Sequence, residues 1–535
     1  MKSEILTVFM LLGAMDGMAQ YPTLTEADKT REATIDSLAK AHADSAWEIA
    51  YPIVMREARE NGRPYIPFAK RPTDLPQAKI PAFPGAEGGG MYSFGGRGGK
   101  VLTVTNTNDD GPGSLRWACD QGGARIIVFN VSGVIKLKTP IIIRAPYITI
   151  AGQTAPGKGV MVTGESIWVD THDVVVRYMR FRRGQTDVAR RDDTFGGNPI
   201  GNIMLDHLSC SFGLDENISF YRHKYQAGAT YQWEKYPTVN VTIQNSISAK
   251  ALDTYNHAFG STLGGENCAF VRNLWACNTG RNPSIGWNGV FCFVNNVVYN
   301  WVHRTVDGGD YSALYNIYNN YFKPGPATPR SGAISHRIVK PEAGLSRNEI
   351  KRYGRVYCEG NIVEGNDSVT ADNWNGGVQI ESLDDEGDQE AMIRWDEPFP
   401  HPHYTVMTAK ESYDYVLKNA GATLPCRDEI DEHIIEEVRT GKAYYSADAQ
   451  PDTIGFKRRL GPDSYKVGIV TTPQQYGGIP DTYGKWKPYK DSDMDGMPDE
   501  WERKNGLNPN DPSDAKEDSD GDGYTNIEEY LNSRD

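Results

Sequence analysis

The sequence has little of three things that would narrow its class quickly: paired cysteines, long apolar runs and positive charge. Its 7 cysteines are odd in number and show no C-x-x-C spacing, so neither a disulfide framework nor a zinc site is expected. Most of them lie inside apolar, strand-like segments, where a thiol serves as a small buried side chain. The formal net charge of -14 and the pI near 5.3 argue against nucleic acid as a partner, because phosphate binding requires a basic face.

Apolar residues gather in one place at the start of the chain. After Lys2 comes the run ILTVFMLLGAM, followed by small residues where a signal peptidase would cleave. This pattern predicts a secretory signal peptide over residues 1–19 and an extracellular or periplasmic protein. Glu4 and Asp16 are unusual in such a segment, so an amphipathic N-terminal helix is the alternative. No other stretch approaches the about 18 apolar residues that a transmembrane helix needs.

Between residues 147 and 363 a short apolar strand followed by Asn or His restarts many times. The repeats are YITIAG, VVVRYMRF, NIMLDHLSC, NVTIQNSIS, CAFVRNLWAC, VFCFVNNVVYN, ALYNIYNNYF and RVYCEGNIVEG. Restarts roughly 22 to 43 residues apart, with each strand too short to bury its face alone, are typical of a stacked solenoid. We therefore predict an all-β fold, a right-handed parallel β-helix, in which residues at equal offsets stack about 4.8 Å apart per rung.

The flanking segments have residue patterns that differ from those of the repeats. Apolar residues at helical spacing predict a helix from residue 25 to about 61. Further on, Thr408 with Glu411 forms a capping box, and a second helix should end on Gly441. The glycine-dense GAEGGGMYSFGGRGG lacks the strand, loop and helix order of a phosphate-binding loop, and tight turns explain it better. We expect an N-terminal helical segment over 20–78, the β-helix over 79–390, a helical extension and extended wrap over 391–488, and a tail over 489–535.

The tail contains two acidic repeats, DSDMDGMPDEWE and DSDGDGYTNIEE. Each fits the calcium loop D-x-[DN]-x-[DN]-G followed by five residues and Glu, which supplies carboxylates at positions 1, 3 and 5 and a bidentate Glu at position 12. The predicted ligands are Asp491, Asp493, Asp495, Asp499 and Glu502 in the first loop, and Asp518, Asp520, Asp522, Asn526 and Glu529 in the second. The repeats resemble EF-hand-like and thrombospondin type 3-like calcium modules. We expect a structural calcium clip; a dockerin-like partner-binding module and a disordered acidic tail are the alternatives.

A column of repeated polar residues gives one reference position in each turn of the solenoid. We count residue offsets from it and call it the ruler. Its predicted members are His207, Asn245, Asn273, Asn296, Asn320 and Asn361. We predict an internal ladder that satisfies backbone groups at a corner, with a catalytic column as the alternative. On this ruler Asp215 and Arg281 share an offset two rungs apart, roughly 10 Å from each other, and Lys250 belongs to the rung between them.

Acidic residues are expected to gather near one end of this line. The predicted cluster is Asp192, Asp193, Asp215 and Glu216, because the turn that carries the first two could fold back toward the others. Such a cluster suits a hard, oxygen-seeking cation such as calcium. Lys250 and Arg281 would then contact the other end of a bound anionic sugar. A surface ion-pair network is the alternative.

A run of arginines forms a locally basic patch in this acidic chain. It consists of Arg180, Arg182, Arg183, Arg190 and Arg191. Such a patch could attract an acidic polymer, and Arg183 is a candidate substrate contact. A solvated strand edge is the alternative.

The stretches that carry these residues resemble polysaccharide lyase family 1, the pectate lyases, over about residues 79–390. The matching pieces are AFPGAEGGG, TNTNDDGPGSLR, NIMLDHLSCSFGLDEN, VTIQNSISAK and TGRNP, of which NIMLDH and GRNP are the most specific. The resemblance implies calcium-assisted β-elimination of pectate, leaving a 4,5 double bond. It implies Asp193 and Asp215 as calcium ligands, Lys250 as a substrate contact of the catalytic set, and Arg281 as the base that takes the C5 proton of galacturonate.

Two positions depart from that family pattern. Ser219 stands where the family often has another acid, a role that Glu216 could take, and Gly286 stands where a second arginine is common. His257 is a candidate substrate contact, with packing as its alternative. An arginine base also needs a site that perturbs it, because a free guanidinium stays protonated.

Two other functions remain possible from the sequence. A β-helix that hydrolyses polygalacturonate would use paired carboxylates to hold a water, but the lysine and arginine would have no role there, and no G-H-G or R-I-K segment is present. A non-catalytic, calcium-dependent glycan-binding β-helix is the third class. In each case we expect a monomer with an acidic polysaccharide as its partner.

Overall fold

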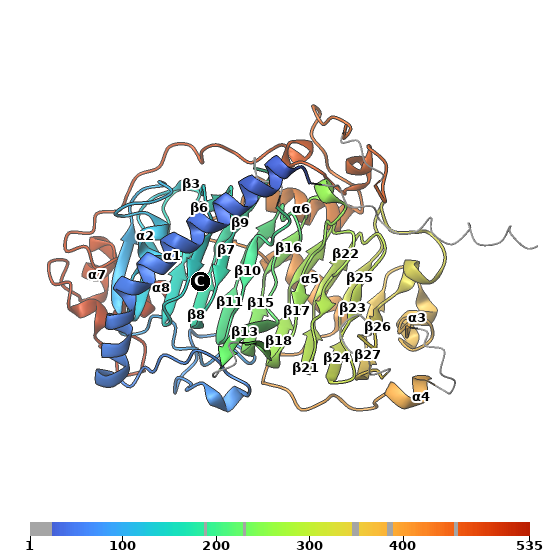
Figure 1. Ribbon diagram of the computed structural model, residues 1–535, viewed down its shortest axis with the longest axis horizontal. Helices are drawn as coiled ribbons and strands as arrows, with labels where there is room; N and C mark the ends of the chain where they lie inside the picture. The colour runs from blue at the N-terminus through green and yellow to red at the C-terminus, as the bar shows by residue number, and fades with distance from the viewer. Residues whose placement is uncertain are drawn as a thin grey trace, which may run out of the picture.

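The structure is a computed structural model that describes residues 24–186, 190–227, 232–344, 352–381, 389–453 and 458–534. Its body is a parallel β-solenoid, as predicted, with helices on its outside (Figure 1). The expected signal peptide over residues 1–19 lies outside the described residues. Among the helices in the described ranges, none combines the length and the apolar character needed to cross a membrane.

Short strands stack along three faces of the solenoid, and the strands within each stack pair in parallel. The first sheet contains β1 (Lys100–Val104), β2 (Arg125–Phe129), β5 (Ile148–Ala151), β8 (His172–Arg177), β11 (Gly201–Asp206), β15 (Val239–Gln244), β18 (Glu266–Val271), β21 (Gly289–Val294), β24 (Ala313–Tyr318) and β27 (Arg355–Glu359). The second contains β3 (Gly133–Lys136), β6 (Val160–Thr163), β9 (Arg180–Arg182), β12 (Ser209–Ser211), β16 (Ile247–Ala249), β19 (Leu274–Ala276), β22 (Val297–Tyr299), β25 (Tyr321–Lys323) and β28 (Ile362–Val363).

The third face is made of two shorter sheets. One contains β4 (Ile141–Ile143), β7 (Ile167–Val169) and β10 (Phe195–Gly197), and the other contains β17 (Thr262–Leu263), β20 (Ser284–Ile285), β23 (Val306–Gly308) and β26 (Val339–Pro341). Isolated bridges from Phe195 to Ile218 and from Phe220 to Leu263 join the two sheets. The turn that carries residues 213–220 therefore lies in the middle of this face.

The core consists of apolar columns that run the length of the solenoid. One column, read through the strand register of the first sheet, contains Ile127, Ile150, Val176, Leu205, Ile243, Phe270, Phe293, Ile317 and Cys358. All of these side chains are buried in one cluster. Burial of such a side chain contributes about 1.5 to 3 kcal/mol. Cys358 fills a position that branched and aromatic residues fill elsewhere. Six of the seven cysteines are buried, as predicted for most of them, whereas Cys426 is exposed.

The predicted ladder is present, but two of its predicted members lie beside it. The ladder contains Ser246, Asn273, Asn296, Asn320 and Asn361, and each backbone N–H donates to the next side-chain Oδ1 at 2.8 to 2.9 Å. His207 and Asn245 align one position earlier, beside Arg272, at φ of 52° and 51°. Asn tolerates this left-handed conformation better than most residues. Asparagine therefore recurs at two adjacent positions, one in the ladder and one in the left-handed conformation. The predicted column mixed these two positions, so its residue offsets are wrong by one.

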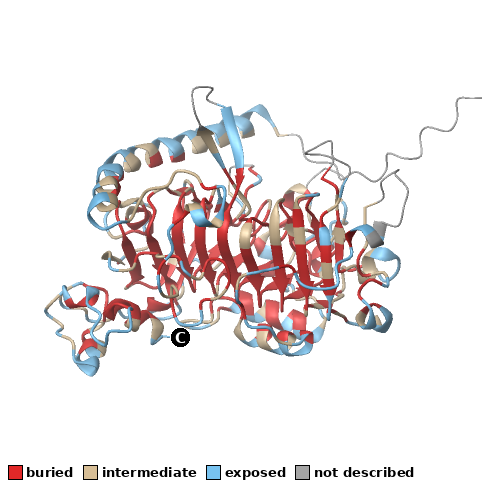
Figure 2. Ribbon diagram, turned by 90° about the horizontal axis from the view of Figure 1, so that it is seen from below, coloured by how far each residue is buried: buried red, intermediate tan, exposed pale blue. Residues whose placement is uncertain are grey.

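Helices cover the outside of the solenoid. The predicted N-terminal helix is confirmed as α1 (Glu26–Glu60), which starts at a capping box and crosses the front of the molecule (Figure 1). The predicted capping box opens α5 (Ala409–Asn419), and α6 (Glu429–Thr440) ends at Gly441; both pack on the second sheet. Shorter helices are α2 (Leu115–Asp120), α3 (Asp367–Ala371) and α4 (Gln389–Ile393). Figure 2 shows that burial is concentrated in the strands, whereas the outer side of α1 is exposed.

Two further elements project from the solenoid or pack on its outside. Strands β13 (Arg222–Ala227) and β14 (Gln232–Pro237) form an antiparallel hairpin. The tail contains α7 (Asp499–Asn505), the 3-10 turn η7 (Asp514–Lys516) and α8 (Asn526–Asn532). Apolar side chains of the tail, Met497 and Ile527 among them, cover Ile126 and Val128 on the outer side of the first sheet.

Candidate functional site

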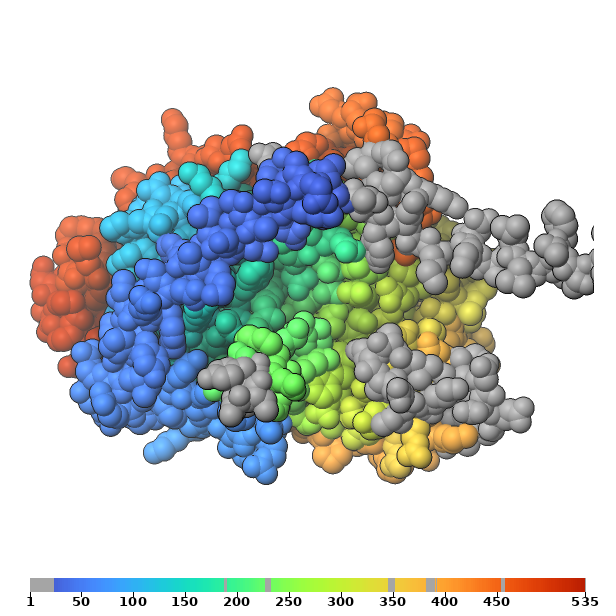
Figure 3. Space-filling view, viewed as in Figure 1, coloured from blue at the N-terminus to red at the C-terminus, as the bar shows by residue number. Residues whose placement is uncertain are grey.

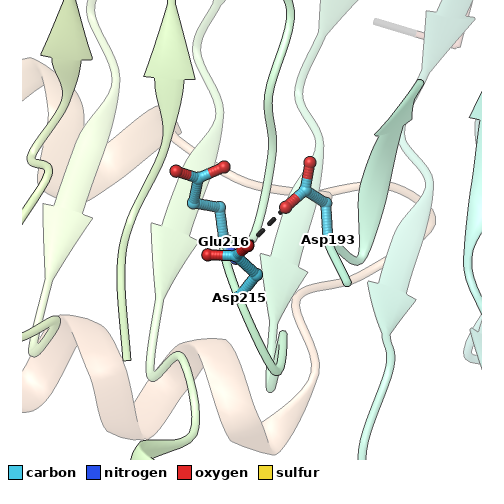
Figure 4. A group of neighbouring side chains, drawn as sticks. All are labelled: Asp193, Asp215 and Glu216. Atoms are coloured by element: carbon cyan, nitrogen blue, oxygen red, sulfur yellow. Dashed lines mark hydrogen bonds between the residues drawn. The ribbon is translucent and has the colours of Figure 1, made fainter. Parts of the chain in front are cut away.

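Three carboxylates meet in the middle of the third face. Asp193 lies in the turn before β10, and Asp215 and Glu216 lie in the turn after β12. One oxygen from each lies within 4.8 Å of the others, and the Glu216 N–H donates to Asp193 at 3.2 Å (Figure 4). A Cβ at Gly196 would come within 2.9 Å of the Asp193 carboxylate, so glycine leaves the space that this carboxylate occupies. We call these three residues the acid cluster.

The electrostatics of the acid cluster fit a divalent cation. Burial raises the pKa of Asp193 well above the usual carboxyl range, and the charges of Glu216 and Asp215 raise it further. Carboxylates forced together in this way are relieved by a hard cation with oxygen preference, and calcium has that preference. The predicted grouping of Asp193, Asp215 and Glu216 is thus present, and its donor set could hold Ca²⁺.

Two basic side chains, Arg281 and His257, border the acid cluster. The guanidinium of Arg281 contacts Glu216, and its Nη1 lies 3.7 Å from Asp215 Oδ1. The His257 Nε2 lies 2.5 Å from the same Asp215 oxygen, and the ring packs on Phe259 with centroids 4.2 Å apart. Burial alone would lower the pKa of Arg281, but the charges of Glu216 and Asp215 outweigh it and raise the pKa. The two carboxylates therefore favour the charged form of Arg281 in this arrangement.

Arg304 joins this site and was missed in the sequence. It stands one rung beyond Arg281, because the Asn282 N–H donates to the Thr305 carbonyl at 2.9 Å. Both guanidinium carbons lie over the ring of Phe259, at 4.4 Å for Arg281 and 4.8 Å for Arg304. The signal was available: Asn273 and Asn296 are separated by 23 residues, and Arg304 follows Arg281 by the same interval.

Lys250 does not lie beside Asp215 and Arg281, where the residue offsets placed it. Its side chain is fully buried, and its Nζ donates to Glu437 and to the Gly468 carbonyl, both at 2.9 Å. The ammonium also lies 4.3 Å from the ring centre of Tyr476. The prediction that Lys250 contacts substrate beside Arg281 is wrong, because α6 and the following wrap cover this turn of the second sheet.

The arginine run is likewise not a basic patch. Arg180, Arg182, Arg183 and Arg190 are all buried. The Nε of Arg183 lies 2.8 Å from Asp192, which also pairs with Arg190 at 3.2 Å. Asp192 therefore neutralises two arginines and lies outside the acid cluster, contrary to its predicted grouping. Arg183, which directly follows β9, is buried and pairs with both Glu165 and Asp192, so it cannot contact substrate from this position.

The two departures from the family pattern have local explanations. The Ser219 hydroxyl donates to Glu216 Oε2 at 2.7 Å and so orients that carboxylate. The Thr262 hydroxyl donates to the other oxygen of Glu216 at 2.6 Å. A Cβ at Gly286 would come within 2.6 Å of the Tyr221 ring, so an arginine at that position has no room.

The front of the solenoid is hollowed beside α1. In Figure 3 the middle of the front of the solenoid is set back between α1 and the β13–β14 hairpin. Asp36 of α1 pairs with Arg190, which fixes the helix beside the third face.

The tail loops lie far along the chain from this face and differ from each other. In the first loop Asp491, Asp493 and Asp495 come together, and in the second Asp518, Asp520 and Asp522 do so. Glu502 is buried against the first group, whereas Glu529 is partly exposed beside the second. The predicted position-9 residues are engaged elsewhere: Asp499 accepts from Lys490 at 2.7 Å, and Asn526 donates to the Asp514 carbonyl at 2.8 Å.

Comparison with known proteins gives consistent relatives. The chain is 34% identical over 462 residues to "Probable pectate lyase C" of Aspergillus fumigatus, covering 84% of this chain and 93% of the relative. It is 33% identical over 460 residues to "Probable pectate lyase C" of Emericella nidulans, covering 84% and 92%. Among solved structures, the major allergen of cedar pollen, jun a 1, matches with a TM-score of 0.42 at 17% identity, covering 63% of this chain and 92% of the allergen. No family model matches the chain.

Proposed function

The chain belongs to the pectate lyase family of polysaccharide lyases, and from that premise we propose that it cleaves polygalacturonate by calcium-assisted β-elimination on its third face. The observation that carries this proposal is the contact of Arg281 with the acid cluster of Asp193, Asp215 and Glu216. A polyuronate supplies the matching chemistry, because its carboxylates and acidic C5 hydrogens call for a cation and a proton acceptor side by side.

Asp193, Asp215 and Glu216 would hold the calcium ion, with Ser219 and Thr262 orienting Glu216. Calcium bound there would neutralise the uronate carboxylate and acidify the neighbouring C5 hydrogen. His257 has a positioning role, since its contact at 2.5 Å fixes the Asp215 carboxylate.

Arg281 is the proposed base. The charges of Glu216 and Asp215 raise its pKa, whereas burial lowers it. If bound calcium neutralises those two carboxylates, burial remains and lowers the pKa of Arg281, which favours the uncharged guanidine. Arg281 then takes the C5 proton, the C5–H electron pair forms the C4–C5 double bond, and the C4–O bond breaks with its electrons moving to oxygen, which takes a proton from solvent.

Arg304 is proposed as the cation for a neighbouring uronate carboxylate, the role first assigned to Lys250. Its guanidinium shares the Phe259 ring with Arg281 and is partly exposed, with 27% of the side chain accessible. Its pairing with Asp307 at 2.9 Å holds it in place one rung away.

Product analysis tests the proposed reaction. Polygalacturonate incubated with the protein and calcium should yield unsaturated oligogalacturonides, which absorb in the ultraviolet and are one water lighter than hydrolysis products. Reducing ends without absorbance would indicate a hydrolase, and no cleavage of any pectic polymer would leave a glycan-binding protein. Excess chelator should stop the reaction.

Secretion and the tail complete the proposal. The N-terminal segment supports export to the extracellular space or periplasm.

The tail loops would bind calcium and so hold the tail on the first sheet, where Met497 and Ile527 cover Val128. This packing favours a structural clip over a dockerin-like module, because the apolar surface of the tail is already in contact with its own solenoid. We propose that the chain acts as a monomer.

A further inference from the structure

The first tail loop has an acidic neighbour that its motif does not contain. Asp514, in η7 between the two loops, lies with Asp495 and Glu502 in one group whose oxygens are all within 4.8 Å of one another. All three residues are buried. Asp495 belongs at the same time to the group with Asp491 and Asp493. Five carboxylates therefore converge on one small volume.

The oxygens of this group are short of partners among the described residues. Glu502 is fully buried, yet neither of its carboxylate oxygens has a hydrogen-bond partner. The same is true of both oxygens of Asp493 and of one oxygen each of Asp495 and Asp514. Leaving one buried polar group unpaired costs about 1 to 3 kcal/mol, and more when it is charged. A hard cation that prefers oxygen ligands, such as calcium, would satisfy this many unpaired acceptors.

Asp514 is held so that one oxygen remains available to this site. Its Oδ2 accepts from the Asn508 N–H at 2.9 Å, while its Oδ1 has no partner among the described residues. Asp499, by contrast, accepts from Lys490 at 2.7 Å and from the Ser492 N–H at 2.8 Å, so its carboxylate is already satisfied. The geometry thus favours Asp514 over Asp499 as the additional acid.

We propose that Asp514 completes the first tail loop as a calcium ligand from outside the loop, and that this ligand couples the two tail loops to each other. The proposal rests on the calcium role proposed above for the tail. It names a site of Asp491, Asp493, Asp495, Glu502 and Asp514, in which Asp499 acts only in the local turn.

The coupling runs through the short η7 turn. The side chain of Asp514 points to the first loop, and its carbonyl accepts from Asn526 of the second loop at 2.8 Å. The Asn526 N–H also donates to the Glu517 carbonyl at 2.7 Å, and Ala515 is buried against the tail core. A cation that fixes Asp514 therefore fixes the start of α8, which follows the aspartates of the second loop. Filling the first loop should tighten the second.

Metal titration of the full chain tests this proposal. The probe is Tb³⁺, which replaces calcium and is excited through Trp501, the neighbour of Glu502; loss of the emission in Trp501→Phe assigns the signal to the first loop. We expect Asp514→Asn to weaken binding at this loop at least tenfold. Asp511→Asn is the matched control, because it removes an acid from the same segment that bonds only to Ser513, and it should bind as the unchanged chain does.

The second loop gives an independent readout of coupling. Calcium calorimetry should show weaker binding at the second loop in Asp514→Asn, although none of that loop's acids has changed. Asp518→Asn with Asp520→Asn identifies which heat belongs to that loop. Unchanged second-loop affinity would overturn the coupling.

Stability separates a ligand from a structural residue. With chelator present, Asp514→Asn should melt at the same or a higher temperature than the unchanged chain, because it removes repulsion among acids; with calcium it should melt lower. Equal destabilisation in both conditions, or Tb³⁺ affinity equal to that of Asp511→Asn, would overturn the proposal. If the unchanged chain gives no Trp501-sensitised emission and no calcium heat, the calcium role of the tail itself fails, which is a distinct result.

Discussion

Two acidic sites in this molecule use the same side chains but are built differently. In the acid cluster of the third face, basic or polar side chains contact two of the three acids: Arg281 and Ser219 contact Glu216, and His257 contacts Asp215. In the first tail loop Asp493 and Glu502 have no hydrogen-bond partner among the described residues. The first site has Arg281 and His257 at its edge, whereas Asp493 and Glu502 of the second site have no such neighbour among the described residues.

This difference separates a reactive site from a structural one. A site that must exchange partners during turnover needs groups that compete for its carboxylates, and Arg281 and His257 do so. A site that only holds a cation needs as many free oxygens as possible. Burial, with added repulsion from the neighbouring aspartates, accordingly raises the pKa of Glu502 to about 8 and of Asp495 to about 7 in the tail. The pKa of Asp193 in the acid cluster is raised as well, so the contact with Arg281, more than the number of acids or their pKa values, distinguishes the site where the chemistry lies.

The largest expected effect comes from removing the base. Arg281→Ala should slow elimination about 1000-fold, because it removes the proposed general base. The rate is followed by the absorbance of the unsaturated uronate, and the melting temperature checks that the fold is intact. Arg439→Ala, an exposed arginine paired with Glu436 on α6, is the control and should be fully active. Retained activity in Arg281→Ala would show that Arg281 is not the base.

Weakening the acid cluster should have the next largest effect. Asp215→Asn should slow the reaction about 100-fold at a calcium concentration that saturates the unchanged chain, because it removes one charge from the proposed ligand set. Raising calcium should restore part of the rate. A rate that is low but independent of calcium would contradict a metal role for Asp215.

Arg304 should act mainly through substrate affinity. Arg304→Ala should raise KM about tenfold with little change in kcat, because a contact to a neighbouring carboxylate is the same in the ground state and the transition state. Arg304→Lys should recover part of the loss, since lysine keeps the charge but not the two-pronged geometry. Equal KM values for the alanine variant and the unchanged chain would exclude Arg304 from the binding surface.

The tail should affect stability and leave turnover unchanged. Removing residues 489–535 exposes Ile126 and Val128 and should lower the melting temperature on the order of 5 °C. Measured well below that temperature, the turnover number should match that of the full chain. A fall in turnover with no change in melting would mean that the tail takes part in the reaction.

Much of the fold could be predicted from local patterns. The repeated strands, the capping box at Thr408 and the helix stop at Gly441 depend on neighbours in sequence, and the structure has them. That Asp215 and Arg281 share one face also followed from the stacking of turns, although the bridges align Gly280 with Glu216, so the two residues do not share an offset as predicted.

The errors arose where a contact depends on a distant segment. Lys250 is covered by Glu437, and Arg182 pairs with Asp428 and Asp431, all from a helix about two hundred residues later in the chain. The ruler also slipped by one at His207, because asparagine suits both the left-handed position and the ladder position beside it. Local spacing could not distinguish a strand edge open to solvent from one covered by α6.

The most direct test of the account is the calcium dependence of elimination in a full chain that carries Asp493→Asn and Asp520→Asn, one change in each tail loop. The initial rate of absorbance increase on polygalacturonate is measured across calcium concentrations, below the melting temperature, beside the unchanged chain. We predict the same half-saturating calcium and the same maximal rate, because the calcium that serves the reaction binds at Asp193, Asp215 and Glu216. A loss of calcium dependence in the tail variant would contradict the assignment of the catalytic calcium to the third face.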